Sequence, residues 1–239
     1  MATPRSTRNS LFLGRWFEDE IIILCVRWYL DFKLSYRDLV RMMADRGIAV
    51  SHTTIMRWVL HYAPEFEKKW KRYARNVGLS WRVDETYIKV CGEWTYLYRA
   101  VDGEGRTVDF WLSQRRDVNA AKCFLRRALR EHGDPLSITL DAYAASHRAV
   151  AQLKEEGEIH YEKMRVRSCQ YLNNIVEQDH RRIKQRLYPM LGLKNFGNAR
   201  VVISGIELAQ KIRKRQFDLR QLGGAQASDA ERWSRVLAA

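Results

Sequence analysis

The hydrophobic pattern of the chain changes at residue 81, and this change constrains the fold more than any other feature. Upstream, apolar residues recur at the spacing of amphipathic helices, first in residues 17–29. Downstream, residues 81–90, 94–101 and 107–113 are rich in Val, Ile, Thr, Tyr and Trp, with Gly-containing breaks between them. The sequence therefore predicts an N-terminal helical part followed by antiparallel β-hairpins.

Two capping signals organise the helical part. Ser35 with Asp38 three residues later predicts a helix start, and Gly47 predicts the end of that helix. Ser51 then begins a second helix. Two helices joined by a short Gly-containing turn are typical of a helix-turn-helix, whose second helix lies in the major groove of DNA. Residues 64–75 are expected to form a separate connecting helix and linker.

The exposed face of this second helix is the candidate DNA-contacting surface. Thr53, Thr54 and Arg57 are expected to face outward, with side chains suited to phosphates and base edges. An ordinary helical hairpin that binds no ligand is the alternative interpretation.

The element order after residue 81 predicts an α/β core. After the three strands we expect two helices that alternate with two strands, and then a further helix. The ranges are helix 118–131, strand 137–141, helix 144–156, strand 159–164 and a helix beginning near residue 174. Three antiparallel strands continuing into parallel α/β units form the ribonuclease-H-like layout.

Charge and composition narrow the function classes. The 239 residues include 42 Lys and Arg against 28 Asp and Glu, a formal net charge of +14, which favours a polyanionic partner over a protein that is merely basic. The excess lies in residues 1–80 (+6) and 161–239 (+9), whereas residues 81–160 carry −1. The apolar runs are too short for a membrane span. Four dispersed cysteines indicate neither a zinc site nor a disulfide scaffold, so we expect an intracellular protein.

Three acids are candidate catalytic and metal-binding residues. Asp84 lies in the first strand, Asp141 ends the fourth, and Glu177 lies in the following helix. Ionised aspartates in such apolar strands are costly unless they are paired or bind metal. Three carboxylates are what two Mg²⁺ or Mn²⁺ ions require for in-line attack on a phosphodiester. Capping or salt-bridging roles are the alternative, because an Asp–Glu separation of this kind is common by chance.

Two cations follow Glu177 along the same helix. Lys184 lies seven residues later and therefore points almost the same way, while Arg181 lies one turn on. Either side chain could hold a DNA phosphate near the metals, and a solvated helix face is the alternative. His180 is expected on the surface of this helix.

The chain resembles the DDE transposases of bacterial insertion sequences, specifically insertion sequence family six. The resemblance rests on four segments: residues 81–102, beginning WRVDETYIKV; 139–148, TLDAYAASHR; 171–180, YLNNIVEQDH; and 205–217. It implies an N-terminal helix-turn-helix DNA-binding region (1–78), a ribonuclease-H-like catalytic domain of the integrase and transposase type (79–191), and a C-terminal helical extension and tail (192–239).

The resemblance also implies residue roles. Asp84, Asp141 and Glu177 would be the catalytic triad and ligands of two Mg²⁺ (or Mn²⁺) ions, Lys184 the basic residue that follows, and Glu85 not a ligand. The separation of 35 residues between the second and third acids is one longer than the family pattern.

The implied reaction is nicking at the terminal inverted repeats, followed by attack of the freed 3′-hydroxyls on target DNA, with a cointegrate as product. The implied partners are double-stranded DNA and further copies of the chain, as a homodimer or larger assembly, in the bacterial cytoplasm at the nucleoid. Two alternatives remain: a ribonuclease-H-like metal nuclease that cuts without joining, and a DNA-binding regulator with an inactive core.

Overall fold

The computed structural model describes residues 9–141, 143–161, 163–168, 174–190, 193–223 and 227–238. In this structure Ser35 and Ser51 each precede a helix. The Ser35 hydroxyl accepts the Asp38 N–H at 3.2 Å while the Asp38 carboxylate accepts the Ser35 N–H at 2.8 Å, which is a capping box. These caps begin α2 (Tyr36–Ala44) and α3 (His52–Lys71), which follow α1 (Asp19–Asp31). The predicted helix-turn-helix arrangement is confirmed.

The predicted break between the second helix of this pair and a connecting helix is wrong. α3 continues through Pro64, although proline removes one intrahelical hydrogen bond. The reason lies in packing, because the buried face of α3 continues at helical spacing past the proline, from Ile55 and Val59 to Phe66 and Trp70. Burial of these large side chains outweighs the cost of the lost hydrogen bond.

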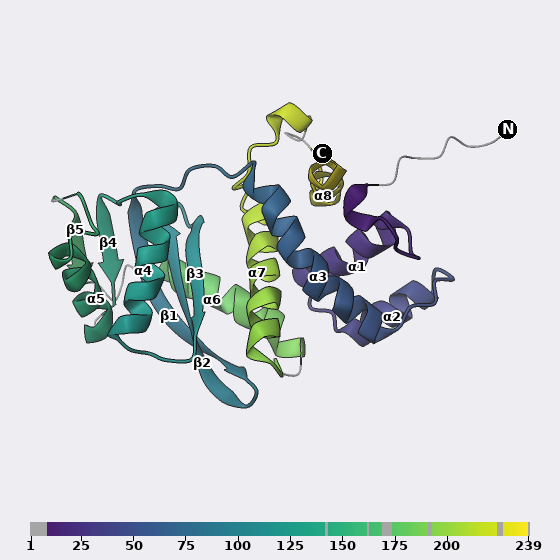
Figure 1. Ribbon diagram of the computed structural model, residues 1–239, viewed down its shortest axis with the longest axis horizontal. Helices are drawn as coiled ribbons and strands as arrows, with labels where there is room; N and C mark the ends of the chain where they lie inside the picture. The colour runs from purple at the N-terminus through teal and green to yellow at the C-terminus, as the bar shows by residue number, and fades with distance from the viewer. Residues whose placement is uncertain are drawn as a thin grey trace. The chain divides into compact units, whose positions relative to one another are not determined.

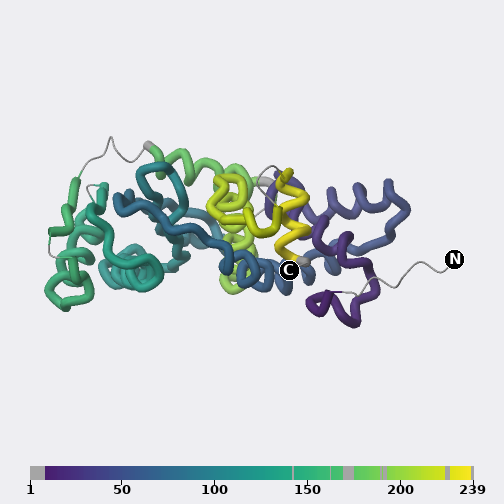
Figure 2. The backbone as a smooth tube through the Cα atoms, turned by 90° about the horizontal axis from the view of Figure 1, so that it is seen from above, coloured from purple at the N-terminus to yellow at the C-terminus, as the bar shows by residue number. Residues whose placement is uncertain are grey.

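The described residues up to 74 and from 201 on form one compact unit, so segments far apart in the sequence share a core (Figures 1 and 2). This unit contains α8 (Asp229–Ala238) and, from residue 201 on, the longer part of α7 (Phe196–Arg213). Short helical turns lie at Ser10–Phe12 and Arg220–Leu222. Trp70 of α3 packs against Trp233 of α8, with ring centroids 5.6 Å apart. Helices α7 and α8 both lie in the predicted C-terminal helical extension and tail (192–239), and α8 was not predicted as a separate helix.

Residues 75–200 form the second unit, which contains a five-stranded sheet. Its elements are β1 (Ser80–Val90), β2 (Glu93–Asp102), β3 (Thr107–Ser113), α4 (Val118–His132), β4 (Ser137–Leu140), α5 (Ala144–Glu155), β5 (Arg165–Ser168), α6 (Asn174–Leu187) and a helical turn at Tyr188–Met190. The strand order is β3-β2-β1-β4-β5, with β1, β2 and β3 antiparallel and β1, β4 and β5 parallel. This order and connectivity confirm the predicted ribonuclease-H-like fold.

Helices cover both faces of this sheet. Val83 of β1 and Tyr98 of β2 belong to a buried cluster with Phe124 of α4 and Leu153 of α5. Side chains alternate along a strand, so the neighbouring residues project from the other face. There α6 contacts β1 and β2 (Figure 1).

The fifth strand lies later in the chain than predicted. Residues 159–164 were expected as a strand because Ile159 and Met164 are apolar, but these two side chains fill the core from a loop. The strand itself is Arg165–Ser168, whose four residues are exposed at the sheet edge. An exposed edge strand carries no apolar alternation, so its sequence gives no strand signal.

None of the helices that the structure describes combines the length and apolar character that a membrane span requires. The predicted boundaries of the DNA-binding and catalytic regions concern function and stay predictions.

Candidate active site

The pairing of β1 with β4 brings acidic residues together. These strands are parallel, and their paired region ends with Val83 opposite Leu140. The next residues are Asp84 and Glu85 on β1 and Asp141 immediately after β4. The acids thus lie just past the carboxyl end of β4, beside the middle of β1, and open α/β sheets bind their ligands beyond the carboxyl ends of their parallel strands.

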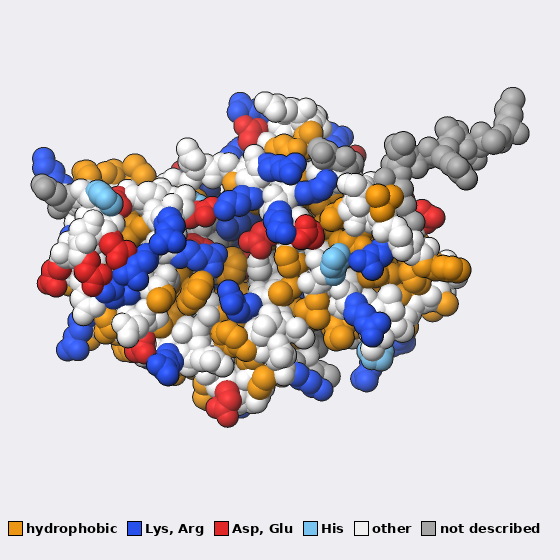
Figure 3. Space-filling view, viewed as in Figure 1, with side chains coloured by type: hydrophobic (Ala, Val, Ile, Leu, Met, Phe, Trp, Pro, Cys, Tyr) orange, Lys and Arg blue, Asp and Glu red, His pale blue; other side chains and the backbone are white. Residues whose placement is uncertain are grey.

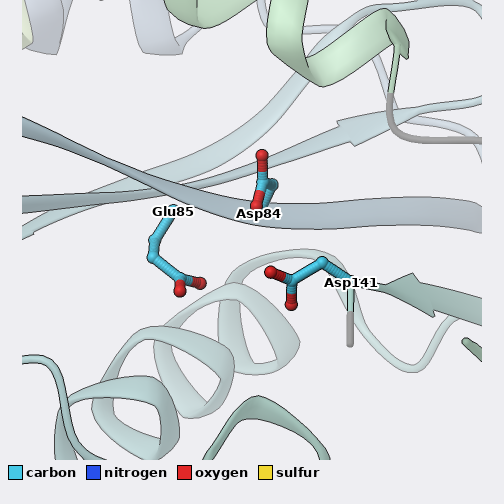
Figure 4. Close-up of side chains that lie close together, drawn as sticks. All are labelled: Asp84, Glu85 and Asp141. Atoms are coloured by element: carbon cyan, nitrogen blue, oxygen red, sulfur yellow. The ribbon is translucent and has the colours of Figure 1, made fainter. Parts of the chain in front are cut away.

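The carboxylates of these three residues converge. One carboxylate oxygen from each of Asp84, Glu85 and Asp141 lies within 4.8 Å of the others. Figure 4 shows that Asp84 and Glu85 leave opposite sides of β1 and that the Glu85 and Asp141 carboxylates face each other. The structure thus brings together two of the three predicted acids and adds Glu85, while their role as ligands stays a prediction.

The Glu85 side chain is only 3% exposed, against 15% for that of Asp84. Its Oε1 atom accepts two hydrogen bonds from Arg116, at 2.8 Å from Nε and 2.5 Å from Nη2. Burial raises the pKa of Glu85, the bond from Arg116 opposes this shift, and the charges of Asp141 and Asp84 reinforce it. Glu85 is therefore harder to ionise than an isolated glutamate, because its carboxyl group is buried beside two other acids.

Tyr143 links Asp141 to Arg116. The Tyr143 backbone N–H donates to Asp141 Oδ1 at 3.0 Å, and its hydroxyl donates to the Arg116 carbonyl at 3.0 Å. The Arg116 guanidinium lies over the Tyr143 ring, 3.8 Å from its centroid. His147 contributes a further contact, because its Nε2 lies 2.8 Å from the Asp141 carbonyl oxygen. Asp141 and Tyr143 are therefore held in part by Arg116 and by His147 of α5.

The third predicted acid lies on α6. Glu177 is exposed in the first turn of this helix and is not part of the carboxylate group above. His180, one turn later on the same side, places its Nε2 3.3 Å from Asp84 Oδ2. The expectation that His180 lies on the helix surface is wrong, since the residue is 5% exposed and faces the sheet.

A buried ion pair also joins α6 to the sheet. Asp179 Oδ2 accepts from Arg99 Nη2 of β2 at 2.9 Å, with side-chain exposures of 8% and 0%. Arg99 pairs with Asp84 in the strand register, so both side chains project from the face that α6 covers. Asp179 and His180 thus attach α6 beside Asp84. Sequence reasoning identified neither residue, because their partners lie about a hundred positions away along the chain.

The predicted cations of α6 are exposed. Lys184 places its Nζ 4.7 Å from the ring centroid of Tyr87 on β1, and Arg181 lies on the outer side of the helix. Lys and Arg side chains are scattered over the visible face of the molecule rather than gathered in one patch (Figure 3). Charge alone therefore does not outline a DNA-binding surface on this face.

The predicted DNA-contacting residues of α3 lie in the other unit. Thr53 and Arg57 are exposed as expected, Thr54 is half-buried, and Ile55 and Val59 are buried on the other side of the helix. The Ser51 hydroxyl lies 2.9 Å from both threonine hydroxyls. These residues are available on the helix surface, and DNA contact by them stays a prediction.

The donor set of the acidic group suits a hard divalent cation. It contains carboxylate oxygens, which Mg²⁺ and Mn²⁺ prefer, and none of the thiolates that select softer metals. One oxygen of Glu85 is buried and has no hydrogen-bond partner among the residues that the structure describes. Such an atom is expected where a ligand completes the site.

Sequence comparisons give the family. Residues 78–216 match a family described as a DDE domain. The transposase for insertion sequence-like element IS431mec of Staphylococcus aureus is 36% identical over 217 residues, covering 89% of this chain and 93% of that protein. The transposase for insertion sequence element IS257 in transposon Tn4003, from the same species, is equally similar.

A solved structure with some similarity is the catalytic core domain of BIV integrase in crystal form I, at 18% identity and a TM-score of 0.42. That similarity covers 55% of this chain and 83% of the other. The family match spans more than half of the chain and the transposase relatives nearly all of it. The chain therefore belongs to the DDE transposases of insertion sequence family six, which are metal-dependent polynucleotidyl transferases.

Proposed function

We propose that Asp84, Asp141 and Glu177 are the catalytic triad and hold two Mg²⁺ or Mn²⁺ ions. The observation that supports this most directly is the approach of the Asp84 and Asp141 carboxylates to within 4.8 Å just past the carboxyl end of β4. Two such cations stabilise the attacking and leaving oxygens of an in-line phosphoryl transfer. Glu177 supplies the third carboxylate from a helix that contacts β1.

The substrate is double-stranded DNA, held by two regions of the chain. Thr53, Thr54 and Arg57 of α3 contact the terminal inverted repeats, with α3 as the recognition helix. Lys184 and Arg181 hold phosphates of the strand that reacts, because they are exposed on the helix that carries Glu177. This DNA-binding assignment rests on exposure, on side-chain chemistry and on the excess of cations at both ends of the sequence.

The reaction has two chemical steps. Hydrolysis at each end of the element breaks a phosphodiester bond and leaves a 3′-hydroxyl, and that hydroxyl then attacks a target phosphodiester while the target strand's own 3′-oxygen leaves. Because hydrolysis and joining are both in-line phosphoryl transfers, one carboxylate site serves both. The expected product is a cointegrate. Two ends must meet, so a homodimer or larger assembly forms on DNA, in the bacterial cytoplasm at the nucleoid.

The test is a joining reaction with the full chain. Purified protein is mixed with Mg²⁺ or Mn²⁺, labelled element-end DNA and a supercoiled plasmid, alongside the Asp141→Asn and Glu177→Gln variants. Glu158→Gln is the matched control, since Glu158 pairs with Arg126 of α4 at 2.5 Å and is not part of the carboxylate group. Joined products should form with the natural chain and the control, and fall to background in the other two variants.

Three other results would overturn the proposal or part of it. Cleavage without joined product would identify a ribonuclease-H-like nuclease. Binding to element ends with neither cleavage nor joining would identify a DNA-binding regulator with an inactive core. Retention of joining by Asp141→Asn would remove this aspartate from the catalytic residues.

A further inference from the structure

The two oxygens of the Glu85 carboxylate have different surroundings. Oε1 accepts both hydrogen bonds from Arg116. Oε2 is buried and accepts none from any residue for which the structure gives a position. The side chain is 97% buried, since only 3% of it is exposed. A buried carboxylate oxygen without a donor is unfavourable, so this atom requires a partner that the described residues do not supply.

The position of this carboxylate indicates the kind of partner. It faces Asp141 across a narrow gap, with Asp84 on the other side of the strand (Figure 4). Three carboxylates meet here, and Arg116 offsets one of the three negative charges. The remaining excess of negative charge, together with an all-oxygen donor set, is the arrangement that binds a divalent cation.

Arg116 also fixes which way Glu85 can face. The guanidinium holds Oε1 through two hydrogen bonds and is itself stacked on Tyr143, the residue whose backbone N–H holds Asp141. The carboxylates of Glu85 and Asp141 are therefore oriented by one connected pair of residues. Such outer contacts keep the ligand oxygens in place before a cation arrives.

We propose that Glu85 is an additional acidic residue of the metal site, with Oε2 directed at the cation and Arg116 as the positioning residue for Glu85. This inference rests on the proposed role of Asp141 as a ligand, and it departs from the expectation, implied by the family resemblance, that Glu85 is not one. The competing explanation is a purely structural ion pair between β1 and the segment before α4.

The two explanations differ in what happens when the charge of Glu85 is removed but its shape is kept. Glu85→Gln retains an oxygen that can accept from Arg116, so the contact to the segment before α4 survives. A ligand role predicts that the affinity for metal falls by about tenfold or more, as it does when groups around metal sites are altered. A structural role predicts unchanged metal affinity.

The experiment is a titration of the full chain with MnCl₂ alone, in which free Mn²⁺ is measured by electron paramagnetic resonance. Glu85→Gln and Asp141→Asn are compared with Glu158→Gln, which alters a carboxylate paired with Arg126 at 2.5 Å outside the site. The expected order is strong binding by the natural chain and by Glu158→Gln, with affinity at least about tenfold lower in the other two variants.

The outcomes separate the two proposals. If Asp141→Asn loses Mn²⁺ affinity and Glu85→Gln stays within about twofold of the natural chain, the inference about Glu85 is overturned while the proposed site stands. If neither variant loses affinity, the proposed site itself fails. Should Glu85→Gln not fold, as judged by circular dichroism, Glu85→Asp replaces it. That variant keeps the charge but withdraws the oxygen by one methylene, so unchanged Mn²⁺ affinity would again overturn the inference.

Discussion

Loss of the ion pair between Arg99 and Asp179 should lower the stability of the second unit, residues 75–200, more than most other single changes there. It joins β2 to α6, with side-chain exposures of 0% and 8% and an N–O distance of 2.9 Å. Asp179→Ala leaves the guanidinium buried without this carboxylate. Breaking a buried pair in this way costs about 3–5 kcal/mol, because the remaining charge stays buried and loses its attraction to this carboxylate.

This cost can be read from thermal unfolding of the full chain by circular dichroism. For a chain of this size, each kcal/mol lowers the Tm by about 2–4 °C, so we expect a decrease of about 6–20 °C. Glu104→Ala is the control, since this carboxylate is 75% exposed and lies 3.4 Å from Arg106, and its loss should cost less than about 1 kcal/mol.

A double variant tests the physical cause. Replacing Arg99 by Met and Asp179 by Leu removes both charges and fills the space with apolar groups, which should restore most of the lost stability. Two results would refute the reasoning: a decrease below about 2 °C for Asp179→Ala, or a double variant that is no more stable than the single one.

Four further changes test other parts of the molecule. Ser35→Ala removes the capping box of α2 and should lower stability by about 1 kcal/mol in urea unfolding, whereas Ser35→Asn should not. Gly205→Ala would place a methyl group 2.6 Å from a buried Leu30 carbon, so we expect a loss of about 1–3 kcal/mol in the same assay. Burial raises the pKa of the Cys25 thiol to about 11. The folded state therefore keeps this proton while the unfolded thiol ionises near pH 9, and stability should fall between pH 9 and 11 in the natural chain but less in Cys25→Ala. Lys184→Gln should weaken binding of element-end DNA in a fluorescence titration and reduce its salt dependence by about one phosphate contact, and an unchanged slope would exclude a phosphate role.

The elements of the sheet could be predicted because their residues are buried in a regular pattern. β3 (Thr107–Ser113) coincides with its prediction, and β1 and β4 differ from theirs by one residue at one end. β5 could not be located because all four of its residues are exposed at an edge. The continuity of α3 through Pro64 was missed for the opposite reason, since tertiary packing overrode a local preference that the sequence displays plainly.

Part of the candidate site was predictable from strand positions. Asp84 and Asp141 could be assigned to one sheet from sequence, because both were expected in or at the end of its strands, and the parallel pairing of β1 with β4 brings them together. The residues that contact these acids could not be predicted from sequence. Arg116 follows β3 and reaches Glu85 of β1, and His180 reaches Asp84 from α6, so both contacts depend on tertiary packing between segments far apart in sequence.

The acids of the site consequently depend on different parts of the fold. Asp84 and Asp141 are fixed by the backbone pairing of β1 with β4, which involves four residue pairs. Glu177 has no such pairing, and its position follows from the contacts of α6, above all those of Asp179 and His180. A change that weakens the contacts of α6 with the sheet should therefore impair a function that needs Glu177. It should impair less a function that needs only Asp84 and Asp141. In the Asp179→Ala variant, joining of DNA ends should accordingly fall further than Mn²⁺ affinity, because the sheet still holds Asp84 and Asp141 together.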